Sequence, residues 1–384
     1  MPVHRSSTDV FAERLTDHEK VTIHMDQLQL FGHGIFSNVY KGRLQHAGST
    51  EKRLVAVKKT WSEGPSERLT EVKILVALNK VPHKNILQLL YHFSQEYPDN
   101  KVSNGLVFEL LEMSLALYLK QKQKDLDIFE AKMFMWQIFR GQLHLSKNSI
   151  CHRDLKPQNI LINSESGLLK IGDFGSSKII RTGVKNYNYH VTRYYRAPEL
   201  ILESNSYGCE IDVWSIGCIL GEMLRGNVFM IGRTTIHQLQ LVVECIGMPT
   251  KADITAMKCR PEKLEEADNT NYLKRYEMNN RDFPYRKFAP SAPDNAMDLL
   301  NKILIYNPKQ RLTGPKALAH PFFADLFAPG AHRANGKPFT LLTPQDHEDA
   351  IAGDPHYDVT ESITGDGKAN GEPKPKPSKS TTKN

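Results

Sequence analysis

The sequence predicts a bilobed α+β fold, with a small β-rich lobe over about residues 26–110 and a larger, mainly helical lobe over about residues 112–327. Short β-branched and alternating runs dominate the first part, whereas apolar residues in the second part recur at helical spacing. The 384 residues are also enough for two or three domain-sized units. We therefore expect a ligand-binding cleft between the lobes.

The first lobe is expected to contain strands and one helix. Residues 28–31 lead into a glycine-rich stretch, residues 39–41 lead out of it, and residues 54–57 form a β-branched run. Residues 67–79 place apolar side chains at helical spacing, which predicts an amphipathic helix. Residues 105–111 form an apolar run that predicts a buried strand continuing into a connector between the lobes.

The second lobe contains four helix candidates, at residues 129–145, 212–224, 296–305 and 315–323. The first of these carries methionine and aromatic side chains mostly on one side. Such a stripe is more often core than a cofactor site, so we interpret it as buried.

The two ends of the chain differ from the lobes in composition. Residues 1–25 are polar and irregular, and we expect a flexible arm there. Residues 328–353 form a C-terminal extension. Residues 354–384 are rich in Gly, Pro, Lys, Ser and Thr, which cannot bury a core, so a disordered tail is expected.

Composition argues against several classes of protein. The net charge of +7 is mild, and no basic run is dense enough to indicate nucleic-acid binding. The five cysteines are far apart and form no Cys-x-x-Cys pair, which argues against zinc and against a disulfide framework. This fits a reducing compartment, and we expect the cytoplasm or the nucleus. No apolar stretch approaches the ~18 residues of a membrane span, so no membrane association is expected.

A glycine-rich stretch lies between two predicted strands at residues 32–39 and reads Gly-His-Gly-Ile-Phe-Ser-Asn-Val. Glycines let backbone amides approach triphosphate oxygens because no Cβ intervenes. The third glycine of the Gly-x-Gly-x-x-Gly pattern is replaced by Ser37, so a plain hairpin explains this stretch equally well on its own. A dinucleotide-binding fold is disfavoured because a helix, rather than a strand, would have to follow.

Residues 55–58 read Val-Ala-Val-Lys and put a lysine near the end of a strand. A cation there can hold the α- and β-phosphates of a nucleotide. It needs a carboxylate to fix its position, and Glu71 on the following helix is the natural partner of Lys58. Either residue alone would be an ordinary surface residue.

Residues 152–159 read His-Arg-Asp-Leu-Lys-Pro-Gln-Asn and give the strongest signal. Phosphoryl transfer to a hydroxyl needs a carboxylate that orients the hydroxyl and accepts its proton, which suits Asp154. Lys156 can neutralise charge on the moving phosphoryl group, and Asn159 can ligate magnesium. An eight-residue match of this kind is rare outside enzymes that use this chemistry.

A second magnesium carboxylate has to come from another segment, and Asp173 provides it. It begins an Asp-Phe-Gly sequence after the strand-like residues 169–171. Magnesium keeps several waters and uses few protein ligands, so one Asp and one Asn suffice. Ala-Pro-Glu at residues 197–199 closes the segment that starts at Asp173.

The order of these motifs resembles that of eukaryotic protein kinases from about residue 26 to residue 327. The position of Lys156 after an Asp-Leu pair is similar to serine/threonine kinases rather than tyrosine kinases. Asp212 resembles the buried structural aspartate of that family, and Arg311 resembles the arginine that pairs with Glu199. The resemblance implies ATP and Mg as cofactors and proteins as substrates.

Four stretches are similar to the glycogen synthase kinase 3 family, namely residues 150–154, 173–178, 190–199 and 334–345. Residues 245–287 resemble the insert of the wider CMGC group, which includes cyclin-dependent and mitogen-activated kinases. The chain is identified as a divergent member of the glycogen synthase kinase 3 family.

The resemblance implies a role for each matched residue. The catalytic residues are expected to be Asp154, Lys156, Lys58 and Glu71. The metal ligands are expected to be Asn159 and Asp173. The nucleotide is expected to contact Gly32, His33, Gly34, Ile35, Phe36, Ser37, Val39, Ala56, Lys58, Phe108, Glu109, Leu111 and Leu161.

Substrate choice and activation also follow from the resemblance. The family binds a phosphate four residues after the target through three cations, of which Arg153 and Lys178 are present. The third position holds Thr70, so a weakened preference for primed substrates is expected. Arg196 is expected to favour proline after the target, and Tyr189 is expected to be phosphorylated in the activation segment.

Two alternatives remain open. A pseudokinase scaffold is disfavoured because Lys58, Asp154, Asn159 and Asp173 are all present. A cyclin-dependent or mitogen-activated kinase is disfavoured because the cyclin-contact helix motif is absent and no Thr-x-Tyr occurs in the activation segment. Scaffold proteins are a further class of partner to expect, and a monomer is expected.

Overall fold

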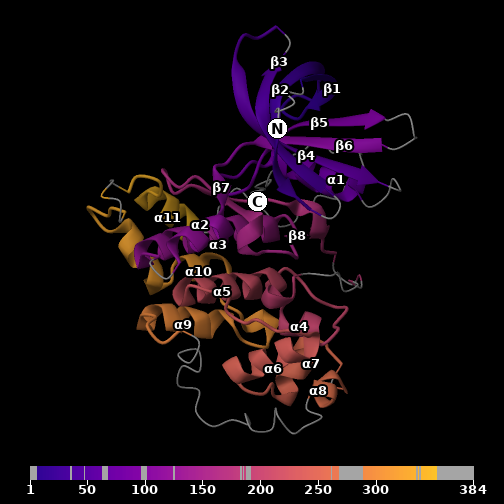
Figure 1. Ribbon diagram of the computed structural model, residues 1–384. Helices are drawn as coiled ribbons and strands as arrows, with labels where there is room; N and C mark the ends of the chain where they lie inside the picture. Colours follow the sequence, from indigo (N-terminus) through magenta and orange to yellow (C-terminus); the bar gives the residue numbers. More distant parts are fainter. Residues whose placement is uncertain are drawn as a thin grey trace, which may run out of the picture.

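The computed structural model describes residues 7–34, 37–46, 48–62, 68–96, 102–123, 126–181, 184, 186, 192–260, 262–267, 289–333, 336 and 339–352. Figure 1 shows a β-rich lobe formed by the first part of the chain and a larger helical lobe formed by the rest. The predicted bilobed α+β architecture is confirmed.

The small lobe is built on a closed antiparallel barrel with the strand order β1-β2-β3-β4-β6-β5. Its strands are β1 Thr8–Arg14, β2 Lys20–His33, β3 Ser37–His46, β4 Lys52–Ser62, β5 Leu89–Glu96 and β6 Val102–Glu109. Alternate side chains point into the barrel, as the period of a strand requires. Ile23, Met25, Val55, Val57 and Val107 are fully buried there.

The expectation of a flexible arm over residues 1–25 is wrong where the structure describes this segment. β1 pairs with β2, and its last residues Glu13 and Arg14 also pair with β5, which closes the barrel. This strand is difficult to recognise in the sequence, because its burial pattern is weak. Phe11 is apolar but exposed, and only the small Ala12 is buried. The lobe therefore begins at residue 8 rather than 26.

One helix accompanies the barrel, α1 Arg68–Lys80, one residue from the predicted range at each end. Its Leu75 is completely buried. The chain then passes through β5 and β6 and continues by β7 Met113–Ser114 into the helical lobe.

The helical lobe surrounds two buried helices, α3 Ile128–Lys147 and α5 Glu210–Arg225, which extend the predicted ranges at both ends. Its other helices are α2 Leu115–Lys122, α4 Pro198–Ile201, α6 Thr235–Ile246, α7 Lys251–Met257, α8 Glu262–Ala267, α9 Asp294–Ile303, α10 Gly314–Leu318 and α11 Pro344–Ala352. Its short strands are β8 Ile150–Cys151, β9 Ile160–Ile162, β10 Leu169–Ile171 and β11 Lys178–Ile179. Among the described residues, no helix is long and apolar enough to span a bilayer.

The single helix predicted over residues 315–323 is wrong. The structure has α10, which ends at Leu318, followed by a separate short helical segment Pro321–Phe327. Pro321 has no backbone N–H and its ring fixes φ, so it begins a new helical segment rather than continuing the old one. The predicted helix over residues 296–305 is present as α9 with a small shift.

A buried ion pair joins two segments of the helical lobe, as the family resemblance implied. The guanidinium of Arg311 donates to both carboxylate oxygens of Glu199 at 2.7 Å. The two side chains are 0% and 2% exposed, and Arg311 also donates to backbone carbonyl groups of Ile305, Tyr306 and Glu210. A buried charge pair needs such additional hydrogen bonds to offset its desolvation.

The C-terminal extension returns to the helical lobe and ends in α11, which lies beside α10 (Figure 1). His347 of α11 stacks on Phe327 with ring centroids 4.2 Å apart. Phe339 packs edge-on against Phe129 of α3 at 5.2 Å. The tail expected to be disordered, residues 354–384, lies outside the described residues.

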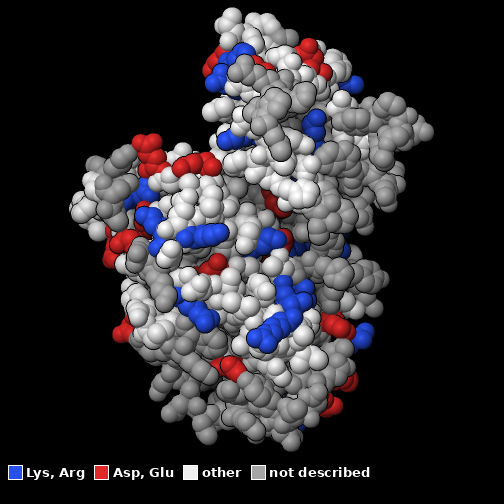
Figure 2. Space-filling model, in the orientation of Figure 1, with Lys and Arg blue, Asp and Glu red and all other residues white. Residues whose placement is uncertain are grey.

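Charged side chains are scattered over the molecular surface. On the face drawn in Figure 2, Lys and Arg lie over the helical lobe in small separate groups, with neutral residues and some Asp and Glu between them. Among the described residues on this face, the basic charge therefore forms no continuous stripe.

The N-terminal strand can be tested with two substitutions. Leu15 directly follows β1 and is 5% exposed, so Leu15→Ala should cost about 2–5 kcal/mol of unfolding free energy. Phe11 lies on the same strand but is 65% exposed, so Phe11→Ala should change stability by only about 0.5 kcal/mol. Urea unfolding measures both, and equally small losses would show that this segment is not part of the folded lobe.

Candidate functional site

A cavity of about 370 Å³ lies between the two lobes. Its walls come from the barrel strands β2, β3 and β4, the connector after β6, and the catalytic segment around β9 and β10. The predicted nucleotide contacts that line it are Gly32, Ser37, Val39, Ala56, Lys58, Phe108, Glu109, Leu111 and Leu161. The sequence therefore located most of this cavity.

Two predicted contacts, His33 and Gly34, do not line the cavity. The His33 ring lies 2.7 Å from the side-chain oxygen of Asn38, and the Gly34 amide donates to the Ser37 carbonyl at 2.8 Å. These contacts join the end of β2 to the start of β3. The other two predicted contacts, at positions 35 and 36, lie outside the described residues.

Several lining residues were not predicted. They are Phe31, Leu87, Leu110, Met113, Ser114, Leu117, Gln158 and Gly172. Most of them are next to predicted residues in the chain and could have been found by extending each motif by one or two positions. Leu87 and Leu117 carry no sequence signal, because only the fold brings them to the cavity.

Lys58 joins both lobes at the end of the cavity. Its ammonium lies 2.7 Å from Glu71 of α1 and 2.8 Å from Asp173 in the other lobe. Burial alone would lower the pKa of Lys58, but the charges of Glu71 and Asp173 outweigh burial and raise it. In return, Lys58 lowers the pKa of Asp173 to about 2. Lys58 and Asp173 are therefore both charged at neutral pH, which suits a site that binds phosphate and a metal ion.

Asp154 and Lys156 lie together, as predicted, and a third residue joins them. The Lys156 ammonium donates to Asp154 Oδ2 at 2.7 Å and to the Thr192 hydroxyl at 2.8 Å. The Thr192 hydroxyl in turn donates to Asp154 Oδ1 at 3.0 Å. The sequence missed Thr192 because its role depends on the activation segment folding back over the catalytic loop.

Asp212 fixes the backbone of the catalytic loop through two hydrogen bonds. Its buried carboxylate accepts the backbone N–H groups of His152 at 2.7 Å and Arg153 at 2.8 Å. Arg153 and Asp173 both have positive φ, 67° and 57°. Such backbone strain in non-glycine residues persists only where surrounding contacts enforce it, and it is typical of functional sites.

The residues present fit a divalent metal ion with oxygen ligands. Asp173 and Asn159 both line the cavity. The Asn159 amide nitrogen donates to the backbone carbonyl of Asp154 at 2.8 Å and to its side chain at 3.0 Å, so the amide oxygen points elsewhere. Asp173 Oδ1 accepts from Lys58, and the Asp173 carboxylate faces the cavity. A carboxylate and an amide oxygen suit magnesium.

Arg153 and Lys178 adjoin each other next to α1. Lys178 lies in β11, opposite Cys151 in the ladder, and β11 contacts α1. Burial and then the neighbouring charge of Arg153 lower the pKa of Lys178. Among the described residues, the Lys178 ammonium has no hydrogen bond or ion pair. Thr70 on α1 is exposed and uncharged, so two of the three expected cations are present.

Of two further predicted residues, Arg196 lies within the described residues and Tyr189 does not. Arg196 is half-buried, and burial followed by the charge of Arg193 lowers its pKa. Its preference for proline stays a prediction. Tyr189 lies outside the described residues, so its phosphorylation also stays a prediction.

The fold and the cluster of Lys58, Glu71, Asp154 and Asp173 define a class of protein. Residues 25–323 match the family described as the protein kinase domain. The chain therefore belongs to the protein kinases, which transfer a phosphoryl group from ATP to proteins with a divalent metal ion.

Two relatives narrow this class. The protein kinase gsk3 of Schizosaccharomyces pombe is 36% identical over 261 residues, which cover 66% of this chain and 64% of that protein. Glycogen synthase kinase 1 of Pyricularia oryzae is 32% identical over 307 residues, which cover 79% of this chain and 73% of that protein. The chain belongs to the glycogen synthase kinase 3 type of serine/threonine protein kinases.

Replacing Thr192 tests its unpredicted role. Thr192→Val keeps the shape of the side chain but removes the hydroxyl that joins Asp154 to Lys156. We expect kcat to fall by about ten- to a hundredfold, because loss of one hydrogen bond to a charged group costs roughly 1.5–3 kcal/mol. The ATP KM should change little. Thr192→Ser retains the hydroxyl and should keep most activity, and a Ser variant as slow as the Val variant would contradict this role.

Proposed function

We propose that this chain transfers the γ-phosphoryl group of ATP to serine or threonine hydroxyls of protein substrates in a magnesium-dependent reaction. One observation carries the proposal. Asn159 donates a hydrogen bond to Asp154 and lines the same cavity as Asp173. The proton acceptor and the two candidate metal ligands therefore adjoin one cavity, which also contains the phosphate-binding Lys58.

Each residue then has a defined task. Asp154 orients the substrate hydroxyl and accepts its proton, and Lys156 neutralises charge on the transferring group. Lys58, fixed by Glu71, holds the α- and β-phosphates. Asp173 and Asn159 would hold magnesium, which when bound neutralises charge on the β- and γ-phosphates.

We also propose that the cation pair Arg153 and Lys178 binds a phosphate already present on the substrate. The two side chains adjoin each other, and the partial burial of Lys178 makes an incoming anion favourable. Thr70 supplies no charge where the family has a third cation. The preference for primed substrates is therefore retained but weakened.

Other properties stay proposals. Binding of scaffold proteins stays a proposal, and residues 257–286, which differ from the scaffold-docking surface of the glycogen synthase kinase 3 family, lie mostly outside the described residues. We propose the cytoplasm or the nucleus as the location, and the five cysteines, all free thiols, are compatible with it.

The proton acceptor can be tested by Asp154→Asn. This change should lower kcat by at least about a thousandfold and leave the ATP KM within a few-fold, because the interaction is felt mainly in the transition state. Asp173→Asn should also abolish turnover, through loss of magnesium binding. Steady-state kinetics with varied ATP and magnesium measure both, and near-normal turnover in either variant would rule out this mechanism.

The priming preference can be tested with two peptides that differ only in a phosphoserine four residues after the target. A missing third cation should reduce the rate ratio between primed and unprimed peptide by about ten- to a hundredfold relative to a three-cation pocket. Thr70→Arg should recover most of that ratio. If the ratio is already high and Thr70→Arg leaves it unchanged, the third cation is supplied by another residue.

A further inference from the structure

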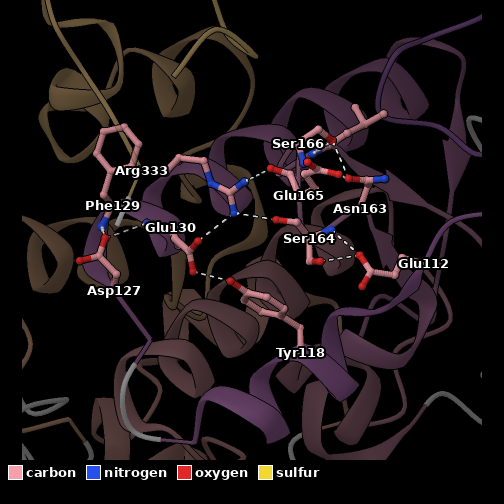
Figure 3. Close-up of polar contacts among 12 residues, drawn as sticks. Glu112, Tyr118, Asp127, Phe129, Glu130, Asn163, Ser164, Glu165, Ser166 and Arg333 are labelled. Carbon is pink, nitrogen blue, oxygen red and sulfur yellow. Dashed lines mark hydrogen bonds and ion pairs between the residues drawn. The ribbon is translucent and has the colours of Figure 1, made fainter. Parts of the chain in front are cut away.

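A buried ion pair joins the C-terminal extension to the helical lobe (Figure 3). Arg333 of the extension donates through Nη2 to Glu130 Oε1 at 2.8 Å, and the two side chains are 3% and 4% exposed. The Tyr118 hydroxyl donates to the other oxygen of Glu130, and Asp127 caps α3 by accepting the backbone N–H of Glu130. Arg333 is therefore held by a fully hydrogen-bonded partner, as a buried charge requires.

Arg333 also donates hydrogen bonds to the turn between β9 and β10 (Figure 3). Its Nη1 donates to the Glu165 carbonyl at 2.6 Å, and its Nη2 donates to the Ser164 carbonyl at 3.0 Å. The turn itself is closed by Asn163, whose side-chain oxygen accepts the N–H of Ser166 at 2.9 Å. The planar guanidinium therefore adds two hydrogen bonds from outside to a turn that Asn163 closes from within.

The other side of this turn holds the connector between the lobes. The Ser164 backbone N–H donates to Glu112 Oε2 at 2.9 Å, and the Ser164 hydroxyl donates to the same oxygen. The hydrogen bond from the Ser164 hydroxyl has the larger effect and the one from the backbone N–H the smaller, and both lower the pKa of Glu112. The Glu112 carboxylate is therefore charged at neutral pH. Glu112 lies between Leu111 and Met113, which both line the nucleotide cavity. Ser164 alone therefore separates Arg333 from the connector.

The extension also reaches the small-lobe side of the connector. The Lys84 ammonium donates to the Leu341 carbonyl at 2.6 Å. Lys84 belongs to the loop between α1 and β5, and Leu87 of that loop lines the cavity. The extension therefore contacts the segments on both sides of the connector.

We propose that Arg333 is a positioning residue for the nucleotide, acting through Ser164 and Glu112 on the connector. The proposal rests on the use of ATP proposed above. By fixing the turn, Arg333 restricts the conformations of the connector and preorganises the cavity wall, which strengthens nucleotide binding. Arg333 touches no reacting group, so its loss acts on ATP binding rather than on the chemical step.

The main test uses variants that avoid leaving a buried charge unpaired. The double variant Glu130→Gln with Arg333→Met removes both charges and leaves an acceptor for Tyr118. Glu112→Ala breaks only the exposed link to the connector. In both, the ATP KM and the Kd for ADP should rise about three- to tenfold, while kcat and the peptide KM stay within about twofold.

A matched control comes from a neighbouring ion pair. Lys132, two residues after Glu130 on α3, pairs with Asp325, and in the described part of the chain neither side chain has a hydrogen bond or ion pair to the turn between β9 and β10. Lys132→Met with Asp325→Asn removes a pair of which only Lys132 is buried, so it should lower the thermal midpoint somewhat less and leave the ATP KM and the ADP Kd unchanged. An equal rise in the control would assign the effect to general destabilisation and overturn the proposal.

Combining the variants tests the route. Because both act on one chain of contacts, adding Glu112→Ala to the Glu130→Gln and Arg333→Met variant should raise the ATP KM by less than the product of the separate effects. Multiplicative effects, or an ADP Kd that stays at the wild-type value, would overturn the proposal. ADP binding is measured without turnover, so failure of the proposed kinase reaction would be visible separately, as a wild-type protein that binds ADP but transfers no phosphate.

Discussion

The active arrangement of this molecule depends on the Lys58 ammonium and the two carboxylates beside it. Lys58 belongs to β4, Glu71 to α1, and Asp173 to the helical lobe, so one cation determines how three separate segments meet. A buried charge that loses a partner is strongly destabilised. Movement of α1 or of the segment at Asp173 away from the cavity would therefore leave Lys58 poorly compensated, which favours the arrangement seen here.

The catalytic loop is positioned by contacts that come from distant parts of the lobe. Asp212 accepts two successive backbone N–H groups of the loop, and Thr192 of the activation segment joins Asp154 to Lys156. The positive φ angle of Arg153 occurs at a residue whose backbone N–H is held by Asp212. The candidate catalytic side chains are thus positioned by residues outside the catalytic loop.

Sequence reasoning selected residues that the structure brings together where chemistry restricts the residue type. A proton acceptor, a phosphate-binding cation and oxygen ligands for a metal can each be only a few amino acids, so Asp154, Lys58 and Asp173 could be chosen as candidates, and the structure places Lys58 beside Asp173 and Asp154 beside Asn159. Sequence reasoning failed where position in space decides, as for Thr192, the strand β1 and the pair Glu130 and Arg333. Residues in such contacts come from distant segments, and several are of types that occur in any surface loop, so no local pattern indicates them.

The closed barrel of the small lobe has a consequence for how the protein is made. The closing contact pairs Glu13 and Arg14 of β1 with Tyr91 and His92 of β5. β1 therefore cannot form this contact until β5 has left the ribosome. Contacts of such sequence separation form slowly, because the chain must close a long loop before they stabilise it. During synthesis β2 therefore has β1 as a neighbour early, while the outer edge of β1 stays unpaired. An unpaired strand edge is a template for joining other chains, so this edge, like the edge of β4 until β6 follows, is exposed to aggregation in the nascent lobe.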